Sequence, residues 1–100
     1  MDKTLTWTPE ALDRYKEIID RIKERWNQRE ATKFAQAVER TTDLIRRYPM
    51  MFRASTVEGH REAVVKPYNI LVYRITEEGI LVVTVWDMRQ HPRRRVLRRR

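Results

Sequence analysis

The sequence predicts an α+β fold in which a helical hairpin packs on one face of a mostly antiparallel sheet. Two early segments, residues 9–26 and 30–48, carry apolar side chains at helical spacing. The chain after residue 60 is rich in β-branched and aromatic residues, as strands are. A short strand pattern at residues 3–7 precedes the helices, so the expected order is β-α-α-β-β-β. Helices followed by a run of strands favour α+β over an alternating α/β fold.

The first strand and the first helix have clear local signals. Residues 3–7 alternate polar and apolar side chains, which is typical of a short strand at a sheet edge. Thr8 fits the N-cap, and Pro9 fits the first helical position, where its missing N–H is harmless. The apolar stripe expected along this helix consists of Leu12, Tyr15, Ile18, Ile19, Ile22 and Trp26.

The second helix is predicted from about Glu30 to Tyr48, after a break at residues 27–29, and Pro49 ends it. Two helices of about 27 Å joined by a short break predict an antiparallel helical hairpin. The side chains expected on the buried side of this second helix are Phe34, Ala35, Val38, Thr42, Ile45 and Tyr48. In the loop that follows, Met50, Met51 and Phe52 are expected to pack against the helices.

The later strands are strongly apolar. Residues 60–66 hold a short strand that ends at Pro67, and residues 68–89 form a long hairpin with a turn at residues 76–79. Gly79 stands at the last turn position, where a positive φ is often needed. Near-continuous apolar strands indicate cover on both faces. Because the helices cover one face, we expect the opposite face and its cationic rim to be open to another molecule.

Charge divides the chain into a single domain at residues 1–92 and an arginine-rich tail at residues 93–100. Residues 1–88 carry 15 Lys and Arg against 14 Asp and Glu, whereas residues 89–100 carry seven arginines and no acid. Such a block is often a polyanion-binding tail, although a solubilising role remains open. The candidate nucleic-acid-binding residues are Lys66, Arg93, Arg94 and Arg95.

Several classes of function and location are excluded or disfavoured. The absence of cysteine excludes disulfides and thiolate metal sites. Two glycines cannot form a Gly-rich phosphate loop, and two histidines with few flanking carboxylates do not suggest a metal site. No cofactor or metal is therefore expected. No apolar run is long enough to span a bilayer, so we expect a cytoplasmic protein without a membrane partner.

Arg61, Arg89 and His91 are the candidate catalytic residues. A guanidinium group can bind two phosphate oxygens at once, and a histidine can exchange a proton near neutral pH. Together they could cut RNA, with a base at the 2′-OH and arginines stabilising the charge on the phosphate. A structural role remains the alternative for each of the three.

Three groups of residues resemble a known family. They are the opening Trp7-Thr8-Pro9-Glu10-Ala11, the helix end Ile45-Arg46-Arg47-Tyr48-Pro49, and the closing strands that end in Trp86-Asp87-Met88-Arg89-Gln90-His91-Pro92. Over residues 3–92 the sequence resembles the RelE/ParE superfamily of bacterial toxins from type II toxin–antitoxin systems. The resemblance implies a growth inhibitor that is silenced by a co-expressed antitoxin, whose segment wraps the toxin in a hetero-oligomer.

The superfamily divides by target. RelE-like members cleave ribosome-bound mRNA, whereas ParE-like members poison DNA gyrase. By position, Arg89 and Arg61 match basic residues of the nucleases, but Ile70 stands where they hold an arginine and their C-terminal tyrosine is missing. The run Arg89-Gln90-His91-Pro92 resembles the ParE-like ending at least as well. Three functions remain open: a gyrase-blocking toxin, a ribosome-dependent endoribonuclease, or a family member that only binds an antitoxin or nucleic acid.

Overall fold

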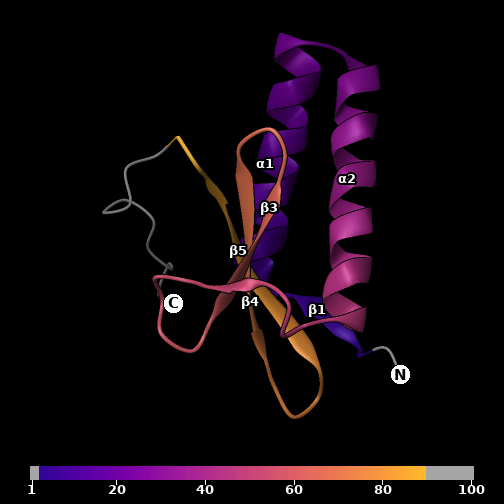
Figure 1. Ribbon diagram of the computed structural model, residues 1–100. Coiled ribbons are helices and arrows are strands. Elements are labelled where there is room, and N and C mark those ends of the chain that lie inside the picture. The colour runs from indigo at the N-terminus through magenta and orange to yellow at the C-terminus, as the bar shows by residue number, and fades with distance from the viewer. Residues whose placement is uncertain (1–2, 90–100) are drawn as a thin grey trace.

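The chain folds into two layers, a helical hairpin and a five-stranded sheet, in a computed structural model that describes residues 3–89 (Figure 1). The elements are β1 (Leu5–Trp7), α1 (Pro9–Arg25), α2 (Gln28–Arg47), β2 (Arg53–Ala54), β3 (Arg61–Val65), β4 (Asn69–Ile75) and β5 (Ile80–Asp87). The strand order is β1-β5-β4-β3-β2. Strand β1 runs parallel to β5, and the other neighbours are antiparallel. The predicted fold class and element order are confirmed, with the two-residue strand β2 added in the segment that was expected to be a loop.

Side-chain caps set the starts of both helices. The Thr8 hydroxyl accepts a hydrogen bond from the Ala11 N–H (3.0 Å) and donates one to the Val83 carbonyl (2.8 Å), which ties the start of α1 to β5. Asn27 accepts a hydrogen bond from the Glu30 N–H (2.9 Å). Helix α2 therefore starts at Gln28, earlier than predicted, because Asn27 is its cap and not part of a longer break.

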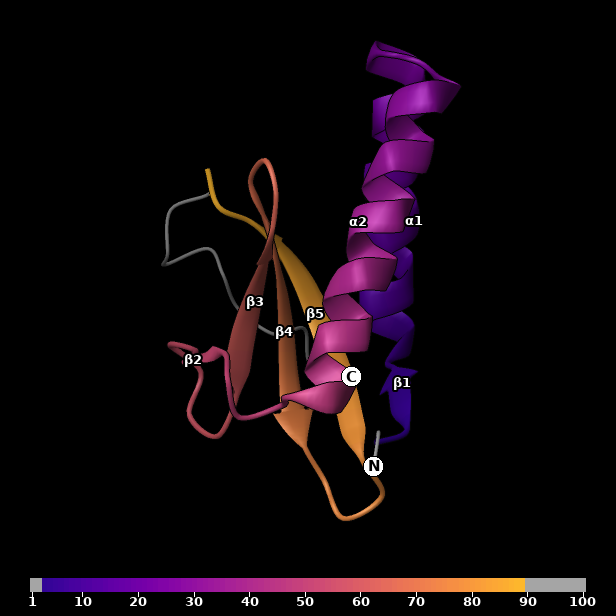
Figure 2. The same cartoon turned by 45° about the vertical axis from the view of Figure 1, so that its right-hand side comes forward.

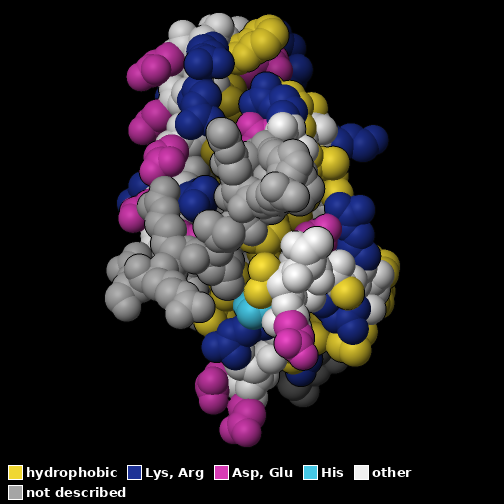
Figure 3. All heavy atoms as spheres, turned by 90° about the vertical axis from the view of Figure 1, so that its left-hand side faces the viewer, with side chains coloured by type: hydrophobic (Ala, Val, Ile, Leu, Met, Phe, Trp, Pro, Cys, Tyr) yellow, Lys and Arg dark blue, Asp and Glu magenta, His cyan; other side chains and the backbone are white. Residues whose placement is uncertain are grey.

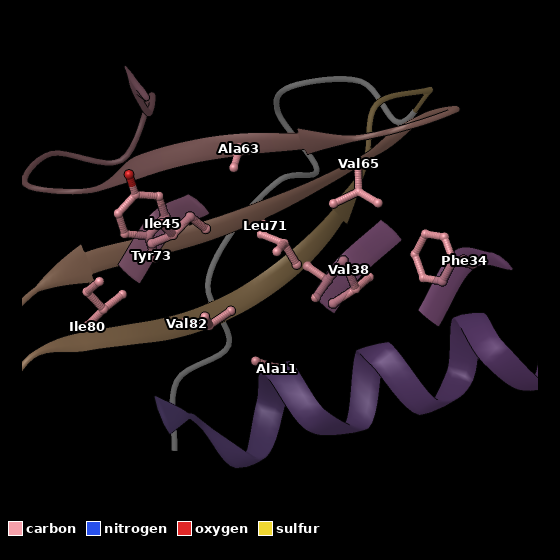
Figure 4. Packing of buried hydrophobic residues seen from close by; sticks show 11 residues of the cluster. Ala11, Phe34, Val38, Ile45, Ala63, Val65, Leu71, Tyr73, Ile80 and Val82 are labelled. Carbon is pink, nitrogen blue, oxygen red and sulfur yellow. The ribbon is translucent and has the colours of Figure 1, made fainter. Parts of the chain in front are cut away.

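The main core lies between the helices and the sheet. Figure 4 shows Leu71 of β4 and Val82 of β5 on the sheet side, facing Ala11 of α1 and Val38 of α2. The small side chain of Ala11 is fully buried, and it lets α1 approach β5 closely. The turn before β5 also lies close to the backbone just before β1. Gly79 has φ +144°, and a Cβ atom there would overlap the carbonyl oxygen of Thr4.

The ends of the helical hairpin differ from expectation. Leu12 and Trp26, both predicted to be buried, are exposed. Figures 1 and 2 show the reason for Trp26: the turn end of the hairpin reaches beyond the strands, so nothing in the sheet covers it. Tyr48, Met50 and Met51 are also exposed at the other end of α2. Those expectations were wrong. Of the three residues Met50, Met51 and Phe52, only Phe52 packs against the main core, edge-on to Tyr73 at 6.2 Å between ring centroids.

The expectation of an open second sheet face is also wrong. Ile70, Val72 and Trp86 point away from the helices and are nonetheless buried, in a second cluster with partly buried Val57 and Val83. Figure 2 places the segment around β2, which leads to Val57, at the edge of the sheet away from the helices. Exposing these three apolar side chains to water would cost free energy, and in this fold they are buried within the chain.

The free energy of unfolding should decrease at alkaline pH because of the buried side chain of Tyr73. Its ring is fully buried and its hydroxyl donates a 2.6 Å hydrogen bond to the Pro49 carbonyl; burial raises the pKa of Tyr73 to about 12. The folded state thus favours the neutral phenol, so the stabilisation is complete below pH ~10 and is lost as the pH rises towards 12, by up to about 3 kcal/mol.

Urea unfolding measured from pH 8 to 11.5 checks this expectation. Tyr73→Phe should lose about 1 kcal/mol at pH 8, because the hydrogen bond is gone, and should show a shallower decline above pH 10. Some decline will remain because burial also raises the pKa of Tyr15. Equal declines in the variant and the wild type would contradict the assignment to Tyr73.

Candidate functional site

A groove of about 620 Å³ opens on the helix side of the sheet, at the turn end of the helical hairpin. Its walls come from the C-terminal half of α1, the N-terminal half of α2, the β3–β4 turn around Tyr68, and the end of β5. The groove exists because the hairpin extends beyond the strands, so the inner sides of both helices lack a sheet beneath them (Figures 1 and 2). This groove therefore lies on the helix side of the sheet and not on the opposite face, where the sequence had predicted an open surface.

The floor of this groove is apolar. Ile18, Ile22 and Trp26 follow one another at four-residue spacing along α1, and Phe34 and Ala37 contribute from α2. Eight helical residues span about 12 Å, so this stripe could contact roughly two turns of another helix. Trp26 is 70% exposed. A large aromatic side chain that is open to solvent inside a groove is typical of a protein-binding surface.

The rim of the groove is mainly basic. Five cations line it against two acids, which are Arg21, Arg25, Lys33, Lys66 and Arg89 against Glu30 and Asp87. Both acids are already paired, Glu30 with Lys33 at 3.5 Å and Asp87 with Arg89 at 2.7 Å. Within residues 3–89, the other three cations form no ion pair. Figure 3 shows Lys and Arg side chains beside a strip of hydrophobic ones in the upper half of the molecule. Such a surface attracts anionic partners.

Arg89 is held at the end of β5 by two neighbours. Its Nε and Nη2 atoms donate to the two carboxylate oxygens of Asp87 at 3.1 and 2.7 Å, and its guanidinium carbon lies 3.7 Å from the centroid of the Tyr68 ring. The hydrogen bond from Arg89, with the charge of Arg21 as a smaller contribution, lowers the pKa of Asp87; the same pair raises the pKa of Arg89. The turn that follows β5 explains the pairing, because the Arg89 N–H donates to the Asp87 carboxylate at 2.8 Å and so holds the two residues together.

The predicted site residues do not gather in one place. Lys66 lies in the groove with Arg89. Arg61 begins β3 at the opposite end of the sheet, and its guanidinium donates to the carbonyls of Phe52 (2.6 Å) and Met50 (3.3 Å). Arg61 pairs in register with Tyr73, which pairs with Val82, and the seven residues from there to Arg89 span roughly 20 Å. His91, Arg93, Arg94 and Arg95 lie outside the described residues.

Sequence reasoning missed most of the groove. Arg21 and Arg25 stand one helical turn apart on α1, and Trp26 directly precedes the break between the helices. Two arginines one turn apart, next to a Trp at the end of a helix, were the available sequence signal for a basic and partly apolar surface. The roles of Tyr68 and Asp87 carried no such signal. No three His, Asp or Glu side chains within residues 3–89 lie close enough to hold a metal ion. Neither described helix is both long and apolar enough to cross a membrane.

Comparison with known proteins finds a matching family and several similar folds. The family model described as the ParE toxin of the type II toxin–antitoxin system parDE matches residues 5–92. A search of curated proteins finds no match. Among solved structures, the chain is similar to a chain of the chromosomal ParDE system from P. aeruginosa, with 17% identity and a TM-score of 0.74 over 85% of this chain and 95% of that one.

Two further structures share the fold. One is a chain of the RelBE2 toxin–antitoxin complex from Mycobacterium tuberculosis, with 20% identity and a TM-score of 0.60, covering 87% of this chain and 99% of that one. The other is a chain of the E. coli DinJ-YafQ toxin–antitoxin complex, with 13% identity and a TM-score of 0.57, covering 87% and 93%. At these identities the likeness establishes the arrangement of helices and strands and nothing finer.

Proposed function

Because this chain belongs to the ParE toxin family of type II toxin–antitoxin systems, we propose that it inhibits bacterial growth by binding DNA gyrase, and that an antitoxin neutralises it by occupying the groove. Gyrase acts in the cytoplasm, so the toxin acts there too. The observation that carries the choice of gyrase over mRNA is the separation of Arg61 from Arg89.

A ribonuclease of the RelE type needs its charged side chains to converge on one phosphate. Arg61 and Arg89 stand at opposite ends of the sheet, and the guanidinium of Arg61 is engaged by backbone carbonyls. A single phosphate cannot contact both arginines, because hydrogen bonds reach only about 3 Å. Contact with a protein target requires no such convergence.

The groove supports an antitoxin as the second partner. Its apolar floor along α1 suits the apolar side of a peptide segment, and its basic rim suits acidic side chains on that segment. The fold neighbours are chains of toxin–antitoxin systems or complexes. An acidic, amphipathic antitoxin segment is the occupant that satisfies both the floor and the rim.

Two assays with purified toxin test the target. We expect the toxin to inhibit DNA supercoiling by gyrase, or to leave gyrase-linked DNA breaks, and to leave mRNA intact on programmed ribosomes. The same toxin mixed with the protein encoded by the adjacent reading frame should lose its effect on gyrase. Arg89→Ala serves as a comparison, since a nuclease that used this arginine would lose cleavage while remaining folded.

Other results would point elsewhere. Cleavage of mRNA at codon boundaries with unaffected gyrase would contradict the gyrase proposal and favour the RelE-like reading. Continued growth of cells that express the toxin alone, with neither effect detected, would indicate a family member that only binds its partner. Failure of the adjacent protein to bind the toxin would contradict the occupancy proposed for the groove.

A further inference from the structure

Arg89, in the turn after β5, is already arranged as a carboxylate-binding site, and the carboxylate that fills it comes from Asp87, the last residue of that strand. Two guanidinium nitrogens donate to the two oxygens of Asp87, and the backbone N–H of Arg89 donates to the same carboxylate at 2.8 Å. The guanidinium also stacks on the ring of Tyr68. Paired donors on an aromatic support are how arginine recognises carboxylates at interfaces.

The internal pair is easily exchanged. The side chains of Arg89 and Asp87 are 58% and 31% exposed, so water and salt screen their attraction. Asp87 also has a second cation within its electrostatic reach, because the charge of Arg21 contributes to its lowered pKa. Arg21 lines the same groove. A carboxylate displaced from Arg89 would therefore still face a positive charge.

The surroundings identify the incoming group as an acidic side chain on an apolar segment. Glu30 already neutralises Lys33, whereas Arg21, Arg25 and Lys66 form no ion pair within the described part of the chain. A phosphate-rich partner would use these cations but would leave the apolar stripe of α1 uncovered. A segment with acidic and apolar side chains would use both, which favours a protein partner over a nucleic acid.

We propose that Arg89 on its Tyr68 support is the subsite for one carboxylate of the antitoxin, and that Asp87 is an internal competitor which that carboxylate displaces. This inference rests on the proposed occupancy of the groove by the antitoxin. In the free toxin Asp87 keeps the subsite filled; in the complex it turns towards Arg21. Only a partner whose acid falls at this point of the groove can make the exchange, so the subsite selects among antitoxins.

The test uses the protein encoded by the adjacent reading frame and measures its dissociation constant by calorimetry at 150 mM salt. Asp87→Asn should tighten binding about threefold to fivefold, because the competitor is lost while Arg89 remains. Arg89→Gln should weaken binding at least tenfold, since the partner's acid loses both donors. In the Arg89→Gln background, Asp87→Asn should change the affinity by no more than the net-charge control, about twofold, because the subsite for which Asp87 competes is gone.

The control for net charge is Asp20→Asn, which makes the same change on an exposed part of α1 outside the groove lining. It should leave the affinity within about twofold, given screening at this salt concentration. Thermal unfolding of every variant excludes a loss of fold, and Asp87→Ser repeats the test with a smaller side chain.

Two results overturn the exchange while leaving the proposed groove occupancy intact. Weaker binding by Asp87→Asn would mean that Asp87 positions Arg89 for the partner instead of competing with it. An equal gain from Asp87→Asn with and without Arg89 would reduce the effect to net charge. If the adjacent protein does not bind the wild-type toxin at all, the groove occupancy fails and the exchange fails with it.

Discussion

Replacing Trp26 by alanine should weaken antitoxin binding by about 30- to 100-fold while leaving the melting temperature within a degree or two. Trp26 is 70% exposed at the turn end of the helical hairpin, so the folded toxin gains little from it. In the groove it is the largest apolar side chain open to a partner. Burying such a ring on binding commonly accounts for 2 kcal/mol or more. Calorimetric titration of both toxins with the antitoxin, beside thermal unfolding of each, measures the two expectations.

Tyr48→Ala is the matched control for this variant. Tyr48 is another aromatic residue at a helix end, it is 55% exposed, and it does not line the groove. Its removal should change the dissociation constant by less than about twofold, because surface substitutions away from an interface usually have small effects. Normal binding by Trp26→Ala together with weak binding by Tyr48→Ala would move the antitoxin to the other end of α2 and contradict the groove.

Trp86→Ala should destabilise the toxin by about 3–5 kcal/mol, a large part of the stability of a domain this size. Trp86 is 1% exposed and packs with Ile70 and Val72 on the face of the sheet that is turned away from the helices. Loss of its ring leaves a cavity as well as losing apolar burial. The melting temperature should fall by at least 12 °C or so, which differential scanning calorimetry can measure.

Two further variants make the result specific. Trp86→Phe should cost much less, because it keeps most of the ring and removes an indole N–H that is buried without a hydrogen-bond partner in the described chain. Val64 lies opposite Ile70 on the same face, but its side chain is 42% exposed. Val64→Ala should therefore lower the free energy of unfolding by less than about 1 kcal/mol. A Trp86→Ala toxin with unchanged stability would show that this face is open, as the sequence had suggested.

Local signals in the sequence were sufficient to predict every helix and strand except the two-residue strand β2, and their order. Thr8 caps α1, Pro49 follows α2, and the turn before Gly79 closes on itself through hydrogen bonds between Thr76 and Gly79. Each depends on atoms within a few residues of one another, so a single sequence contains the whole cause. The same holds for the class of fold, because two amphipathic helices followed by apolar strands have few other ways to bury their surfaces.

Only the tertiary structure decided which side of the sheet is hollow and which charges meet. The offset between hairpin and sheet that exposes Trp26 is a distance between elements, and no run of neighbouring residues encodes it. Arg61 and Arg89 both looked like site residues by position, yet strand register places them at opposite ends of the sheet and puts Lys66 in the same groove as Arg89. Arg89 meets Tyr68 because β4 and β5 pair from residue 69 to residue 87. Contacts between distant segments depend on register and packing, which is why the composition of the groove emerged only in three dimensions.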